Sequence, residues 1–131
     1  MHLLVKVLIV VVLVFLLFKR QPSNDPMILQ VRKNFRKLDP TYGEIPIMEA
    51  KRGTFTENKS TIYLCVRDPK TGMYYDMNTI MYVALHELAH VLSQKEGHTQ
   101  EFLTNFNILL KKAIAAGIYV ASQPPNTYCT I

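Results

Sequence analysis

The chain has 131 residues, enough for one domain at most. Three of its 15 basic residues, Lys6, Lys19 and Arg20, belong to an apolar N-terminal segment, which leaves 12 basic against 10 acidic residues elsewhere. This near balance argues against a nucleic acid as partner, and two cysteines are too few for a disulfide scaffold.

The first 20 residues are expected to form an uncleaved transmembrane anchor. They are apolar except at His2, at Lys6 and at the closing Lys19-Arg20, and as a helix the run from Leu3 to Phe18 would span roughly 24 Å. A cleaved signal peptide is the alternative, but no small residues stand at cleavage-site spacing. The positive-inside rule then predicts a single-pass membrane protein with its C-terminal domain on the cytosolic side. The basic residues that follow the segment are Lys19, Arg20, Arg32, Lys33, Arg36 and Lys37.

Residues 21–131 are expected to form one small α+β domain. A first helix begins at Ser23–Pro26, where a capping side chain precedes proline, and ends at Asp39-Pro40. Its basic face either contacts anionic lipid headgroups or is simply solvated. Ile45–Glu49 is a short edge strand or a loop, and Thr61–Arg67 alternates like a strand with one apolar face. Met73–Tyr75 could be a brief returning strand.

A second helix is predicted from Asp76 or Asn78 to Leu92, and a last one from Thr99 to Ala116. Between Ile80 and Leu92 the strongly polar side chains are His86, Glu87 and His90. A helix that is apolar nearly all round is buried, and polar groups within it need a partner. The spacing of these three polar residues indicates why they lie in a buried helix.

His86, Glu87 and His90 form an H-E-x-x-H motif. Histidines four apart on a helix lie about 40° from each other around its axis, so both imidazoles can reach one ion. We expect one Zn²⁺ per chain, because neutral imidazoles suit zinc and hydrolysis needs no redox chemistry. Glu87 would be the general base for a zinc-activated water.

A catalytic zinc usually has three protein ligands, so a third is needed. His98 is the expected one, because Gly97 lets the backbone turn sharply before it. Glu101 and Glu96 are the alternatives. Tyr119 and Tyr128 are candidates for stabilising an oxyanion, although no spacing selects either.

Cys65 and Cys129 show no spacing typical of a metal site. We expect two buried or free thiols, with a single disulfide as the alternative.

The stretch from Tyr74 to Phe102 resembles the WLM-domain metallopeptidases, relatives of the SprT-like group. The likeness rests on H-E-x-x-H followed by Gly97-His98 and by Phe102, and extends more loosely from Ser60 to the C-terminus. It implies zinc on His86, His90 and His98, Glu87 as catalyst, and a minimal gluzincin-like fold in which a small sheet packs on the motif helix. The edge strand of that sheet would border the cleft, and Thr61–Arg67 would fit it. Compact versions with an N-terminal hydrophobic segment look like proteins of large DNA viruses, which implies a virion or host membrane for the anchor.

The sequence therefore predicts a transmembrane helix (1–20) followed by a zincin-like domain (21–131), acting as a membrane-anchored zinc metallopeptidase on a protein or peptide substrate. The alternative is a non-catalytic membrane or virion structural protein that zinc stabilises. The sequence defines neither the substrate nor the oligomeric state.

Overall fold

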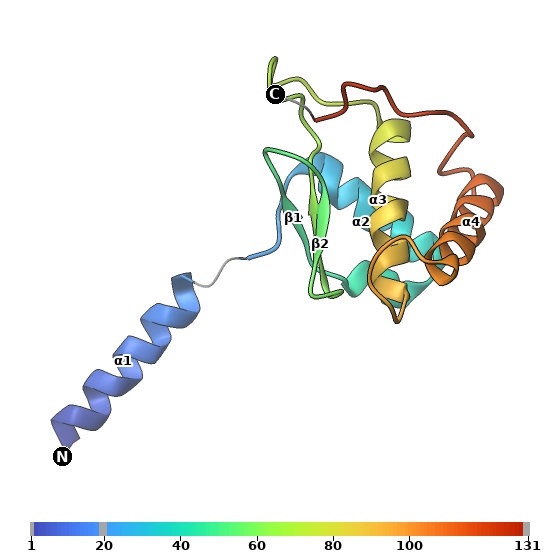
Figure 1. The fold of residues 1–131 in the computed structure, drawn as a ribbon. Helices are drawn as coiled ribbons and strands as arrows, with labels where there is room; N and C mark the ends of the chain where they lie inside the picture. Colours follow the sequence, from blue (N-terminus) through green and yellow to red (C-terminus); the bar gives the residue numbers. More distant parts are fainter. Residues whose placement is uncertain (1, 19–20, 130–131) are drawn as a thin grey trace.

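The computed structural model describes residues 2–18 and 21–129, and these form an α+β arrangement. Along the chain, two α-helices precede a small sheet and two α-helices follow it (Figure 1). The elements are α1 (His2–Phe18), α2 (Pro26–Leu38), the 3-10 helix η1 (Pro40–Glu44), β1 (Ile47–Glu49), β2 (Phe55–Glu57), β3 (Thr61–Leu64), α3 (Met77–Leu92) and α4 (Gln100–Ala115).

The starts of α2, α3 and α4 follow from local capping chemistry. Asp25, Asp76 and Thr99 each accept a hydrogen bond from a backbone N–H in the first turn of the helix that follows. Pro26 occupies the first position of α2, where a missing N–H costs no hydrogen bond. The predicted beginnings of these helices are confirmed.

The sheet has the strand order β1-β3-β2, with β1 parallel and β2 antiparallel to β3. The sequence-based assignment of Thr61–Arg67 as the edge strand is therefore wrong, because β3 is the central strand. The two edge strands are β1 and β2, and β2, which has three residues, was not predicted. Its residues carry too short a pattern to stand out, since a strand of this length is defined by its pairing with β3.

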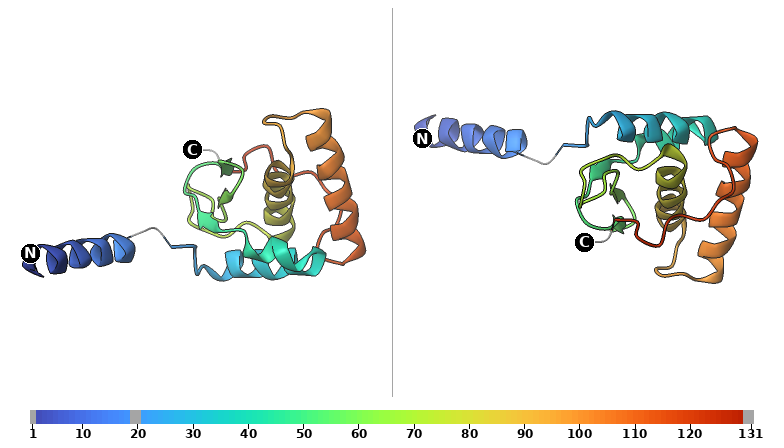
Figure 2. Two further views of the ribbon diagram at one scale, coloured as in Figure 1. Left: turned by 90° about the horizontal axis from the view of Figure 1, so that it is seen from below. Right: turned by 90° about the horizontal axis from the view of Figure 1, so that it is seen from above.

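Helix α3 lies between the sheet on one side and α4 on the other, and α2 runs along the same core (Figures 1 and 2). One face of the sheet and the apolar faces of these helices meet in a single cluster of buried side chains. Its members include Ile28, Val31 and Phe35 of α2, Ile62 and Leu64 of β3, Ile80, Leu85 and Leu88 of α3, and Phe102 and Leu109 of α4. The burial of α3 on several sides agrees with its apolar sequence.

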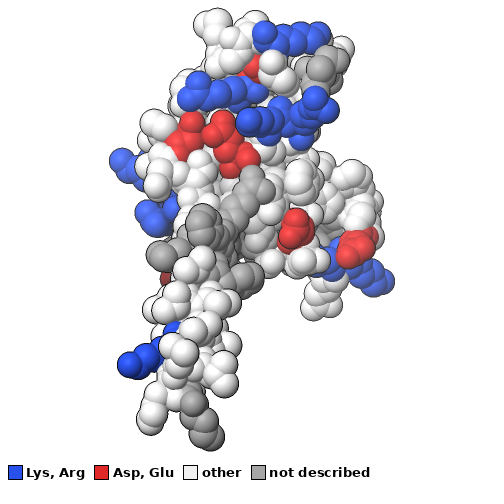
Figure 3. Space-filling view, turned by 90° about the vertical axis from the view of Figure 1, so that its left-hand side faces the viewer, with Lys and Arg blue, Asp and Glu red and all other residues white. Residues whose placement is uncertain are grey.

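Helix α1 stands apart from this core (Figure 1). Its apolar side chains from Leu3 to Val14 are exposed. This helix contains a single Lys or Arg, whereas Figure 3 shows many charged side chains on the rest of the molecule. Within the described ranges no helix is both long and apolar enough to cross a membrane. The predicted transmembrane anchor, and with it the single-pass membrane localisation, is wrong. α1 has 17 residues, and a spanning helix needs about 20.

Lys19 and Arg20, which were expected to mark the end of the anchor, lie outside the described residues.

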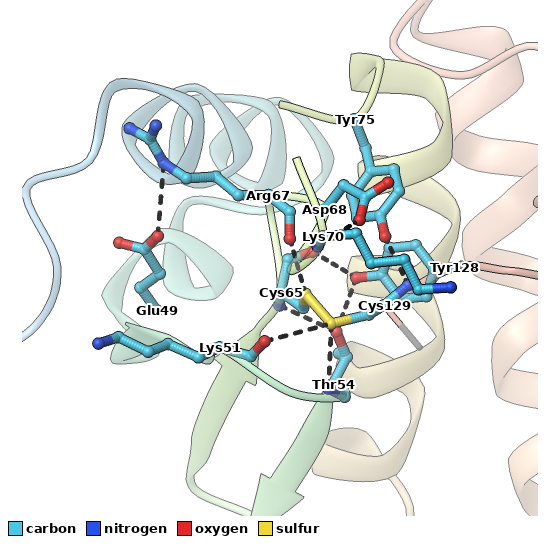
Figure 4. Close-up of a disulfide and its surroundings, with 11 residues drawn as sticks. Glu49, Lys51, Thr54, Cys65, Arg67, Asp68, Lys70, Tyr75, Tyr128 and Cys129 are labelled. Atoms are coloured by element: carbon cyan, nitrogen blue, oxygen red, sulfur yellow. Dashed lines mark hydrogen bonds and ion pairs between the residues drawn. A yellow bond between two sulfur atoms is a disulfide. The ribbon is translucent and has the colours of Figure 1, made fainter. Parts of the chain in front are cut away.

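Cys65 and Cys129 form a disulfide, with their Cα atoms 6.4 Å apart (Figure 4). The expectation of two unpaired thiols is wrong. The C-terminal segment runs back to the sheet, where the Cys129 N–H donates to the Tyr75 hydroxyl at 2.6 Å and the Gly53 N–H donates to Cys129 Sγ at 3.0 Å. The disulfide thus ties the C-terminal segment to the end of β3, and the Gly53 hydrogen bond ties it to the residues that precede β2.

Candidate metal centre

Three histidines converge on one point beside α3. The ring nitrogens of His86, His90 and His98 lie within 4.8 Å of one another. His86 Nε2 is 3.3 Å from His90 Nε2 and 3.2 Å from His98 Nε2. Ligand nitrogens around a tetrahedral zinc, each about 2.0–2.1 Å from the ion, lie about 3.3 Å apart. The distances from His86 to the other two histidines therefore match those expected around zinc.

His86 and His90 are brought together by the helical repeat, whereas His98 is brought by the loop after α3. Gly97 has a φ of +82°, which few residues other than glycine adopt readily, and it turns the chain just before His98. The alternative ligand Glu101 is engaged elsewhere, because its Oε1 accepts hydrogen bonds from the backbone N–H groups of Gln94 and Lys95 at 2.9 and 3.1 Å. These bonds lower the pKa of Glu101. Glu96 lines the same cleft without joining the cluster of donor atoms.

The ring of Phe102 forms an apolar wall behind the three imidazoles. Its centroid lies 4.2 Å from that of His90 and 4.9 Å from those of His86 and His98. Burial, followed by the charges of His90 and His98, lowers the pKa of His86 from 6.5 to about 4. Burial also lowers the pKa of His90, with His98 adding to the effect. Both imidazoles are consequently neutral near pH 7, the form that binds a metal ion.

Glu87 is buried, with 7% of it exposed, and its carboxylate faces Thr56 of β2. Burial raises the pKa of its carboxyl group, and a hydrogen bond from Thr56 acts in the opposite direction. Thr56 Oγ1 donates to Glu87 Oε2 at 2.6 Å. Sequence reasoning missed Thr56, because it lies in a three-residue strand and meets Glu87 across 31 positions of sequence.

A cleft of about 480 Å³ opens over the histidines and Glu87. Its other wall is formed by β2 and the turn after it, including Phe55, Thr56 and Lys59. Because β2 is the edge strand next to this cleft, its backbone edge is open to pairing with an extended chain. The cleft therefore combines a metal-donor set, a carboxylate and a strand edge.

The two tyrosines considered as oxyanion stabilisers do not line this cleft. The Tyr119 hydroxyl donates to the Ser122 carbonyl at 2.9 Å, and the Tyr128 hydroxyl donates to the Cys65 carbonyl at 2.5 Å. Both hydroxyls hold the C-terminal segment in place. The histidines and Glu87 are thus brought together as the sequence predicts, and the tyrosines are not.

The chain is similar to several viral proteins. It is 44% identical over 91 residues to the uncharacterized protein 042R of Invertebrate iridescent virus 3, a match that covers 69% of this chain and 57% of that protein. It is 44% identical over 89 residues to the uncharacterized protein 136R of Invertebrate iridescent virus 6, covering 66% of this chain and 49% of that protein. It is 41% identical over 108 residues to the uncharacterized protein R325 of Acanthamoeba polyphaga mimivirus, covering 79% of this chain and 53% of that protein.

The chain therefore spans about half the length of the relatives that it matches. Their origin is consistent with the expected likeness to viral proteins. No protein-family model matches the chain, and no solved structure matches it. Membership of the WLM or SprT-like group stays a prediction.

Proposed function

We propose that this protein is a zinc-dependent hydrolase that cleaves peptide bonds, with His86, His90 and His98 as zinc ligands and Glu87 as general base. The proposal is carried by one observation: three imidazole nitrogens within 4.8 Å of one another stand next to a buried carboxylate in an open cleft. A purely structural zinc site has no use for that carboxylate. The described residues offer three candidate zinc ligands at this point, which would leave the fourth position of a tetrahedral zinc to water.

Zinc in this site would supply Lewis acidity, both to a water molecule and to the carbonyl oxygen of the substrate. Glu87 accepts the proton that the water loses as it attacks the carbonyl carbon, and donates that proton to the departing amine. An extended peptide lies along β2, whose free edge holds the scissile bond over the histidines. This pairing uses backbone groups, so it is compatible with many side chains in the substrate.

The test pairs zinc content with proteolysis in the wild type and in Glu87→Gln. The substrate is a tryptic peptide library, in which new amino termini are counted by mass spectrometry. We expect about one zinc in both proteins and cleavage by the wild type alone. Glu96→Gln is the matched control, because it removes the same charge from the same cleft and should leave cleavage unchanged. Zinc binding without cleavage by the wild type would instead favour the structural role.

A further inference from the structure

Thr56 is the hydrogen-bond partner of the Glu87 carboxylate from across the cleft. Its hydroxyl lies 2.6 Å from Glu87 Oε2 and 3.3 Å from the backbone carbonyl oxygen of the same residue. A hydroxyl has one proton to give, and the charged oxygen at the shorter distance is the stronger acceptor. The proton therefore lies between Thr56 and the carboxylate.

The second oxygen of this carboxylate, Oε1, has no hydrogen-bond donor among the residues that the structure describes. Glu87 lines the cleft, so this oxygen is available to a group that enters it. A carboxylate with no fixed oxygen can rotate about its last bond, which has a broad torsional preference. The bond from Thr56 restricts that rotation and assigns the two oxygens different tasks.

The position of Thr56 is itself fixed from both sides. Thr56 is paired with Ile62 of β3, and the strand's alternation turns its side chain toward α3. On one side of it, the Thr54 hydroxyl accepts the Cys65 N–H at 3.0 Å and lies 2.8 Å from the Tyr128 hydroxyl, next to the disulfide (Figure 4).

On the other side of Thr56, β2 ends in a tight turn. Asn58 and Lys59 have φ values of 53° and 55°, the left-handed backbone that allows a tight turn between the paired residues Glu57 and Thr61. The Lys59 ammonium donates to the backbone carbonyl of Gln94, in the loop just after α3. β2 is thus tied to the disulfide at its start and to the end of the motif helix after its turn, so the Thr56 hydroxyl is presented from a fixed support.

We infer that Thr56 is the positioning residue for Glu87: its hydroxyl holds Oε2 so that Oε1 faces the cleft and exchanges the proton of hydrolysis. This inference rests on the proposed function. Valine at position 56 keeps the branched shape and the strand preference of threonine and removes the hydroxyl, whereas serine keeps the hydroxyl.

The experiment measures steady-state cleavage, on the peptide that the wild type cleaves fastest in the library, by the wild type, Thr56→Val and Thr56→Ser. We expect Thr56→Val to lower kcat by roughly 10- to 100-fold with KM and zinc content unchanged, because a misplaced group costs rate rather than binding. Thr56→Ser should restore most of kcat. Thr61→Val, in the neighbouring strand, is the matched control, because its hydroxyl has no hydrogen bond with a described residue. Equal kcat in the wild type and Thr56→Val overturns the inference.

A second measurement does not depend on activity and separates failure of this inference from failure of the proposed function. Unfolding equilibria of Thr56→Val, Glu87→Leu and the double variant form a cycle. We expect the two changes to be coupled by about tenfold or more in the unfolding equilibrium constant, the scale of a hydrogen bond to a charged group. If the wild type cleaves nothing, the proposed function fails, but coupling between the two changes would still support the hydrogen bond by which Thr56 positions Glu87. Additive changes in the free energy of unfolding would refute that role of Thr56.

Discussion

Removal of the disulfide between Cys65 and Cys129 should destabilise the protein strongly. The cross-link closes a loop of 64 residues, for which the loss of chain entropy in the unfolded state corresponds to about 4 kcal/mol. In a chain of this size each kcal/mol lowers Tm by roughly 4 °C, so Tm should fall by about 15 °C. The assay is thermal unfolding, followed by circular dichroism, of the wild type and of Cys65→Ala/Cys129→Ala.

The control is the same pair of proteins in reductant. Reductant should bring the wild-type Tm close to that of the double variant and leave the variant unchanged. If the denatured wild type, kept free of reductant, reacts with a thiol reagent at both cysteines, no disulfide exists. An unchanged wild-type Tm in reductant would refute the reasoning from loop closure.

Three further predictions concern the metal centre. In the metal-free protein, the free energy of unfolding should fall as the pH drops from 6.5 through about 4. Burial lowers the pKa of His86 to about 4, so the unfolded chain takes up that proton first. Urea unfolding at successive pH values should show a weaker dependence of this free energy on pH for His86→Asn. Zinc should be lost in His98→Ala and kept in Glu101→Ala, by metal analysis after dialysis, and the reverse would identify Glu101 as the ligand. Phe102→Ala should lower the free energy of unfolding by about 3–5 kcal/mol, because the ring is 2% exposed, and a loss below about 1 kcal/mol in urea unfolding would contradict its place in the core.

Features that depend on neighbouring residues could be predicted from the sequence. Asp25, Asp76 and Thr99 begin helices where a capping side chain precedes a helical pattern, since the hydrogen bonds involved join residues two or three positions apart. The same holds for His86 and His90, which the helix alone brings together. These parts of the fold and of the site need no knowledge of the rest of the chain.

Features that depend on distant segments could not be predicted. The disulfide requires the path of the C-terminal segment back to the sheet, and β2 acquires its place only by pairing with β3. Thr56 was missed for the same reason, since its hydroxyl meets Glu87 across 31 positions of sequence. The position of His98 lies between these cases, because Gly97 indicated a turn and left its direction open.

The apolar N-terminal segment was predicted correctly as a helix and wrongly as a membrane span. An apolar composition indicates that α1 could enter a membrane, but a helix must also be long enough to cross it. The run of roughly 24 Å was already shorter than a span requires, and the apolar composition was given too much weight.

The most direct test of a hydrolytic zinc site is a titration of activity with metal. The 131-residue chain is stripped of metal with a chelator, the chelator is removed, and zinc is added in steps while cleavage of the peptide library is measured. Our account predicts that cleavage returns in proportion to added zinc and reaches a plateau at one zinc per chain. Tight binding of one zinc with no cleavage at any point of the titration would contradict it.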